Sequence, residues 1–211
     1  MDELALEDVT LVLQDWGGGV GIDYAMSHED NVRGIAFFNA ITTPEEWHDL
    51  RRPIYNLYAE LRDSESGPEL IQEENIFIET LLPAFSGRPL SEAELDAYRV
   101  GFETPADRAP ILSWVREIPI DGDPADVQAR LADNYSALQA SDVPLLMLEP
   151  SNTEGELREN NDLLIDELPR MEVEVVGEGL HFLQESAPTS VGLAISDWIA
   201  ELPEWQPGAG L

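Results

Sequence analysis

Four short runs of apolar, largely β-branched residues stand out along an otherwise polar chain. They cover residues 9–14, 32–39, 143–149 and 171–176. Runs of this length and composition are typical of β-strands, and the first two are continuous enough to be buried on both faces of a sheet. The pattern therefore predicts a sheet of about four parallel strands.

Helical segments separate these runs. Residues 17–28 lie between the first two strands, residues 154–168 lie between the last two, and an amphipathic segment, 187–201, follows the fourth. Strands that alternate with helices in this way form parallel sheets with helices on their faces. The predicted fold class is therefore α/β.

The block from 44 to 140 interrupts this alternation. Its pattern is mostly helical, and we expect an inserted helical subdomain between the second and third strands. Prolines mark the joints between its short segments, at Pro44, Pro53, Pro68, Pro83, Pro89 and Pro105.

The charge of the chain narrows the class of protein and its partners. It has 43 acidic and 11 basic residues, a net charge of -32, and every basic residue is arginine. A solvating acidic shell spread along the whole chain is one way in which halophilic proteins stay soluble in brine. We therefore expect a cytoplasmic protein of a halophile. Nucleic acids and anionic membranes are poor partners for such a surface.

Several features argue against other classes. The chain has no cysteine, so it forms no disulfide, and three histidines without cysteine argue against a transition-metal site. We expect no metal and no cofactor. The start, "MDELALEDVT", is acidic and does not resemble a signal peptide, and no apolar run approaches the roughly 20 residues that a membrane-spanning helix needs.

The stretch "VTLVLQDWGGGVG" (9–21) places a carboxylate at the end of an apolar strand, directly before three glycines. A dinucleotide-binding loop needs G-x-G-x-x-G, and counting from Gly17 and Gly19 puts Ile22 at the third position. The other hypothesis is a strand-to-helix nucleophile elbow at Asp15. Backbone N–H groups and the dipole of a helix N-terminus stabilise negative charge there. A carboxylate so placed can attack an alkyl carbon and form an ester.

The elbow and the segments around it resemble the haloalkane dehalogenases, α/β-hydrolase-fold enzymes with an Asp nucleophile followed by Trp. The resemblance covers nearly the whole chain. It implies a partial α/β-hydrolase fold, with the core at 1–43 and 141–211 and a helical cap at 44–140. The segments that carry it are "LVLQDWGGGVG" (11–21), "NVRGIAFFNAI" (31–41), "IFIETLLPAFSGRPLSEAELDAYRVGF" (76–102), "LSWVREIPIDGDPADV" (112–127) and "GLHFLQESAP" (179–188).

Matched residue by residue, the resemblance implies hydrolysis of a small halogenated alkane by water. Asp15 matches the nucleophile, Trp16 a halide-binding residue and His181 the general base. Phe77 and Leu81 fall in the cap segment that lines the family's pocket, although core packing explains them nearly as well. His28 and His48 match nothing catalytic, and we expect both to be exposed.

The acid that orients the histidine is not settled by the resemblance. One family position for it holds Asn39, and the other, after the third strand, holds Asn152. Glu149 and Glu154 lie nearby and remain candidates, with Asn39 and Asn152 in possible supporting roles.

The resemblance begins inside the family pattern, because Asp15 follows Met1 closely. We expect a chain without the N-terminal third of a dehalogenase, impaired in catalysis and open to self-association along its exposed first strand. Two alternatives are a non-catalytic remnant and an epoxide hydrolase of the same fold. The latter needs cap tyrosines, and the candidates are Tyr55, Tyr58, Tyr98 and Tyr135.

Overall fold

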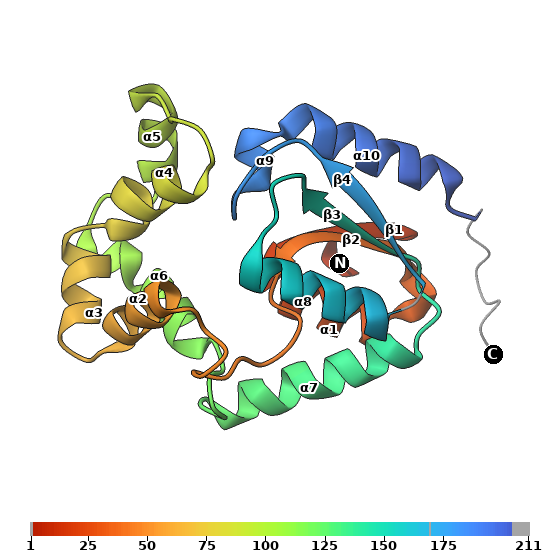
Figure 1. Cartoon of the computed structure of the whole chain (residues 1–211), viewed down its shortest axis with the longest axis horizontal. Helices are drawn as coiled ribbons and strands as arrows, with labels where there is room; N and C mark the ends of the chain where they lie inside the picture. Colours follow the sequence, from red (N-terminus) through yellow and green to blue (C-terminus); the bar gives the residue numbers. More distant parts are fainter. Residues whose placement is uncertain (1, 169, 204–211) are drawn as a thin grey trace. The chain divides into compact units, whose positions relative to one another are not determined.

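A computed structural model of the chain describes residues 2–168 and 170–203 (Figure 1). Residue contacts divide the chain into two compact units. The sheet unit comprises the described parts of 1–43, 130–178 and 187–211, and the helical unit comprises 44–129 and 179–186. In the described residues no helix is both long and apolar enough to cross a membrane.

The sheet unit is built on four parallel strands in the order β1-β2-β3-β4. This confirms the α/β prediction. One row of the register runs across the whole sheet, through Leu11, Ile35, Leu145 and Met171. The strands span Val9–Asp15 (β1), Val32–Ala40 (β2), Leu145–Pro150 (β3) and Met171–Val176 (β4).

Both faces of the sheet are covered. One face of the sheet packs in a single apolar cluster that includes Ile22, Leu138 and Leu168. On the other face Trp198 packs over Gly34 and donates from its indole Nε1 to Glu172 at 2.9 Å. The helices are α1 (Trp16–Ser27), α7 (Ala125–Ala140) and α8 (Gly155–Glu167) on the first face and α10 (Pro188–Glu201) on the second, with short 3-10 turns at Asp2–Leu4 (η1) and Glu29–Asn31 (η2).

The first strand is an edge of the described sheet. Among the described strands β1 pairs with β2 alone, and β4 pairs with β3 alone. Val12, in the middle of β1, is 50% exposed. An exposed apolar edge strand presents unpaired backbone groups to other chains.

The helical unit consists of short segments, many of them opened by proline. Its core is formed by Leu61, Ile71, Leu112 and Val115. The segments are α2 (Arg52–Arg62), α3 (Ser66–Pro68), the π-helices η3 (Glu69–Glu73) and η4 (Phe77–Leu81), α4 (Leu82–Phe85), α5 (Glu92–Arg99), the 3-10 helix η5 (Pro105–Arg108), α6 (Ala109–Glu117) and α9 (Leu183–Ser186).

Two arginines satisfy the main-chain carbonyls that these short helices leave open. Arg62 Nη1 donates to the carbonyls of Val115 and Ile118 at 3.1 and 2.6 Å, at the end of α6. Buried Arg108 donates to the carbonyls of Phe102 and Gln72 at 2.8 and 2.5 Å. Because the last carbonyls of a helix have no partner within it, a planar guanidinium with several donors suits this position.

The contact division differs from the sequence boundaries at two places. Residues 130–140 of α7 group with the sheet unit, where Leu138 joins the core. Residues 179–186 group with the helical unit, although they follow β4 in the sequence. The segment that carries His181 therefore belongs by its contacts to the helical unit.

Candidate active site

The turn at Asp15 joins β1 to α1 without an intervening loop. Asp15 ends the strand and is the N-cap of the helix, with φ 51° and ψ -130°. A positive φ is unfavourable for a residue with a β-carbon, and such strain is concentrated at functional turns. The Oδ1 atom of Asp15 accepts the Trp16 backbone N–H at 2.6 Å. The strand-to-helix elbow predicted at Asp15 is therefore present.

The neighbouring strand ends in a second unusual turn, at Asn39. Gln14 pairs with Phe38 and Asp15 pairs with Ala40, so that Asn39 bulges out of the register. Its φ is 43°. The ladder then closes through the Ile41 N–H, which donates to the Asp15 carbonyl at 2.9 Å. Asp15 and Asn39 thus lie together at the carboxyl edge of the sheet, the edge at which open α/β sheets bind ligands.

Trp16 is the first residue of α1 and is partly buried. Its six-membered ring lies beside Gly19, where an added β-carbon would come within 3.7 Å of the ring. The sequence places an indole N–H donor directly after the proposed nucleophile. An indole has one N–H and no acceptor, so it suits an anion.

The two candidate acids differ in their surroundings. Glu149, in β3, is 3% exposed, and both its carboxylate oxygens accept from α8. Arg158 Nη1 donates to Oε2 at 2.8 Å and Asn161 Nδ2 donates to Oε1 at 3.0 Å. Glu154 is exposed at the N-cap of α8 and makes no side-chain capping bond, and Asn152 is exposed in the preceding turn. The Glu149 carboxylate is therefore bonded to two side chains of α8. Which of the two acids orients His181 stays a prediction.

His181 is partly buried in the helical unit. Its ring meets the Phe182 ring edge-on, with centroids 4.8 Å apart. His28 and His48 are both exposed, as predicted. His28 stacks on Tyr24 at 4.5 Å.

Phe77 and Leu81 lie one turn apart in η4, and both are partly buried. Their side chains pack against the core of the helical unit. This placement accounts for their apolar character through packing alone. Whether they also contact a substrate stays a prediction.

One group of side chains in the described residues has the spacing of a metal site. Glu46, His48 and Asp49 bring their ligand atoms within 4.8 Å of one another, and all are exposed. The His48 ring nitrogens face the two carboxylates, at 3.1 Å from Glu46 and 3.4 Å from Asp49. Exposed acidic groups commonly lie this close together without a metal ion.

Two of the tyrosines that an epoxide hydrolase would need are engaged with carboxylates. The Tyr98 hydroxyl donates to Glu185, and the Tyr135 hydroxyl donates to Glu167 at 2.7 Å. Burial, followed by the bond to Glu167, raises the pKa of Tyr135. A hydroxyl that already donates its proton has none to give to an epoxide oxygen.

Comparison with known proteins identifies the class. A haloalkane dehalogenase from Sphingobium indicum is 40% identical over 198 residues, which cover 92% of this chain and 65% of the relative. Another from Mycolicibacterium smegmatis is 38% identical over 205 residues, which cover 95% of this chain and 65% of the relative. No family model matches the chain.

Solved structures agree. The haloalkane dehalogenase DatA from Agrobacterium tumefaciens is 33% identical, with a TM-score of 0.84, and the match covers 96% of this chain and 69% of that one. DbeA from Bradyrhizobium elkani is 34% identical, with a TM-score of 0.87, and the match covers 94% of this chain and 69% of that one.

The parallel sheet, the flanking helices and the elbow define a protein of the α/β-hydrolase fold. The chain belongs to the haloalkane dehalogenase family. It spans 65% of the length of the curated relatives it matches.

Proposed function

We propose that this protein hydrolyses small halogenated alkanes to an alcohol and a halide ion through an ester on Asp15. The observation that carries the proposal is the elbow itself. It holds a carboxylate in a strained turn at a helix N-terminus, with Trp16 next in the chain. Membership of the haloalkane dehalogenase family supports the same chemistry.

In the first step, a carboxylate oxygen of Asp15 attacks the carbon that bears the halogen. A carbon–oxygen bond forms, the carbon–halogen bond breaks, and the halide leaves with the bonding electrons. The Trp16 indole N–H donates to the halide as its negative charge develops. Donors aimed at developing charge are a large source of rate enhancement. This step needs no base.

In the second step, His181 takes a proton from water, and the resulting hydroxide attacks the carbonyl carbon of the Asp15 ester. The alcohol leaves with a proton from the imidazolium, and the Asp15 carboxyl group that remains releases its proton to solvent, which restores the carboxylate. Glu149 and Glu154 remain the candidates for the acid that orients His181. Glu154 has the exposed carboxylate, whereas α8 side chains engage both oxygens of Glu149.

The acidic surface supports a further part of the proposal. With a net charge of -32, the chain suits the cytoplasm of a halophile and repels nucleic acids and anionic membranes. The edge strand β1, with half-exposed Val12, supports self-association of chains. Light scattering of Val12→Lys against the unchanged chain tests it. Equal sizes for both would count against association through β1.

The activity is tested by halide release from 1-bromobutane, with mass spectrometry of the intact chain. The unchanged protein, which we expect to be impaired in catalysis, should release bromide slowly, and Asp15→Ala should release none. His181→Phe should instead retain the butyl group on Asp15, since only the second step needs a base. Absence of the butyl adduct in His181→Phe would refute the ester mechanism. Hydrolysis of 1,2-epoxybutane without bromide release would favour the epoxide hydrolase alternative.

A further inference from the structure

The segment Gly179–Ser186, which carries His181, contacts the rest of the helical unit at several points. The first contact is a hydrogen bond between main chains. Phe182 N–H donates to the Phe85 carbonyl at 3.0 Å, so that the residue after the histidine is fixed to the end of α4. A main-chain bond adjacent to His181 restricts the path of the backbone on which the imidazole stands.

The second contact is the close approach of Gly87 to the start of this segment. Its φ is 69°, in the left-handed region that glycine adopts readily. A β-carbon at Gly87 would lie 3.5 Å from both the Gly179 Cα and the Leu180 N, immediately before His181. The backbone turn at Gly87 therefore abuts the start of the histidine segment.

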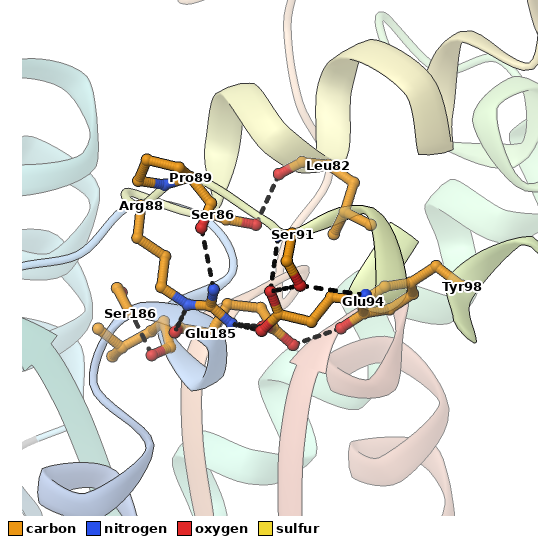
Figure 2. Close-up of polar contacts among 10 residues, drawn as sticks. Leu82, Ser86, Arg88, Pro89, Ser91, Glu94, Tyr98, Glu185 and Ser186 are labelled. Carbon is orange, nitrogen blue, oxygen red and sulfur yellow. Dashed lines mark hydrogen bonds and ion pairs between the residues drawn. The ribbon is translucent and has the colours of Figure 1, made fainter. Parts of the chain in front are cut away.

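The third contact is made by Arg88, which bonds the other end of the segment (Figure 2). Its Nε donates to the Glu185 carbonyl at 2.6 Å, and its Nη2 donates to Glu185 Oε2 at 2.8 Å. One guanidinium thus holds both the main chain and the side chain of the same residue. The planar guanidinium holds its donors in a fixed fork, which matches this carbonyl and carboxylate better than the rotatable donors of a lysine ammonium.

Arg88 is itself fixed by the start of α5. Its Nη2 also donates to Glu94 Oε1 at 2.7 Å, while Glu94 Oε2 accepts the Ser91 N–H and hydroxyl, each at 2.7 Å (Figure 2). One turn further along α5, Tyr98 donates its hydroxyl to Glu185 Oε1. Both carboxylates are therefore shared between α5 and Arg88.

The pair of Arg88 and Glu185 is more shielded from water than an ordinary surface ion pair. The side chains of Arg88 and Glu185 are 34% and 18% exposed. Charge-assisted hydrogen bonds shielded from water are screened less by salt than exposed pairs. The bond from Arg88, followed by those from Ser91, lowers the pKa of Glu94 to about 2. Burial, followed by the bond to Glu185, raises the pKa of Tyr98 to about 12.

We propose that Arg88 is a positioning residue that holds the His181 segment in place through the main chain and side chain of Glu185. The proposal rests on the proposed function, in which His181 activates water. It separates the two chemical steps, because the attack by Asp15 needs no base and ester hydrolysis does. Loss of Arg88 should therefore slow the second step and spare the first.

The test compares Arg88→Met with Arg99→Met in the full chain. Methionine keeps an unbranched stem and removes every donor. Arg99 is a matched control, because it lies in the same unit and bonds Glu79, Glu92 and Asp96 but no residue of the histidine segment. With 1-bromobutane, Arg88→Met should keep a first-turnover burst of bromide while its steady-state kcat falls about 10–100-fold. Butyl ester should accumulate on Asp15 in Arg88→Met and not in Arg99→Met.

A second readout does not depend on activity. The chain has three histidines, so their ring signals in NMR spectra are few and assignable. Arg88→Met should shift or broaden the His181 signal and leave those of His28 and His48 unchanged, whereas Arg99→Met should alter none of them. Arg88→Lys should fall between the unchanged chain and Arg88→Met in both measurements.

The outcomes separate the two proposals. If the unchanged chain releases no bromide, the proposed function fails, and the His181 signal still decides whether Arg88 positions the segment. If Arg88→Met loses the burst and the turnover equally, or leaves kcat and the His181 signal unchanged, Arg88 is not a positioning residue for His181.

Discussion

A β-carbon on Gly18 would lie 2.6 Å from the main-chain oxygen of Ile41. It would also lie 2.8 Å from the β-carbon of Ala40, at the end of β2. The first turn of α1 therefore rests directly on the backbone that follows β2, with no side chain between them. This contact fixes the helix whose N-terminus carries Asp15 and Trp16.

The contact predicts opposite effects for substitutions at two adjacent glycines. Gly18→Ala should lower the free energy of unfolding by about 1–3 kcal/mol, because backbone atoms must move to admit the methyl group. Gly17→Ala is the matched control, since its added β-carbon would meet nothing within 4 Å. It should be neutral or stabilising by up to about 1 kcal/mol, because alanine favours helix. Denaturant titration in concentrated salt measures both. Equal stability of the two variants would contradict the close contact.

Glu149 provides a second prediction. Its side chain is 4% exposed, whereas that of Arg158 is 41% exposed. Arg158→Met leaves the carboxylate with Asn161 alone and should cost about 1–3 kcal/mol of unfolding free energy. Glu149→Met together with Arg158→Met should recover part of that loss, because no unpaired buried charge remains.

Arg170→Met is the control for this pair. The carboxylate that Arg170 pairs with, that of Asp142, is 99% exposed, so the loss should be below about 1 kcal/mol. If Arg170→Met and Arg158→Met lower the free energy of unfolding equally, the bonds from Arg158 and Asn161 to Glu149 do not anchor α8.

The cluster around Arg88 predicts a dependence on acid pH. The folded-state pKa of Glu94 is about 2, below its ordinary value of 4.5, chiefly through the bond from Arg88. Stability from a depressed carboxyl pKa is present above the unfolded-state value and is lost as the pH falls through the folded-state value. The stability difference between the unchanged chain and Arg88→Met should therefore be constant above pH 4.5 and shrink toward pH 2. A difference that does not change with pH over this window would contradict the assigned bond.

The acidic surface predicts a requirement for salt. The 43 acidic residues far outnumber the 11 arginines, so repulsion between carboxylates opposes the compact state in dilute buffer. At about 1 M salt the Debye length falls to roughly 3 Å, and this repulsion is screened. Circular dichroism should show a higher melting temperature in molar sodium chloride than in dilute buffer. Identical melting curves would show that the surface is not a salt adaptation.

The sequence alone determined the strands and the elbow. The predicted runs 9–14 and 171–176 match β1 (Val9–Asp15) and β4 (Met171–Val176) closely. The run 9–14 is recognisable because it is almost entirely apolar, as a strand of a parallel sheet is expected to be. The run 171–176 is recognisable instead by its β-branched residues, because β4 contains two glutamates and is buried only at its two ends. The elbow could also be recognised from the sequence, because the strand, the acid and the glycines follow one another around Asp15.

The pattern of the helical block predicted helix but not its hydrogen-bonding register. Phe77–Leu81 forms a π-helix, and its Phe77 and Leu81 side chains pack against the core of the helical unit. The bulge at Asn39 was also outside sequence reasoning, because it exists only in the pairing of β2 with β1. Periodicity in the sequence identifies a helix or a strand, whereas the elements that pack or pair with it decide its bulges and its hydrogen-bonding register.

The tertiary structure alone decided which distant groups meet. Arg88 and Glu185 are separated by 97 positions in the chain, and Glu149 and Asn161 by 12. A guanidinium in the sequence "SGRPL" carries no local mark of its partner, because any of many acids would satisfy it equally well. Only the folded chain, by bringing Gly179–Ser186 against the end of α4, adds Glu185 to the nearby Glu94 as a partner of Arg88.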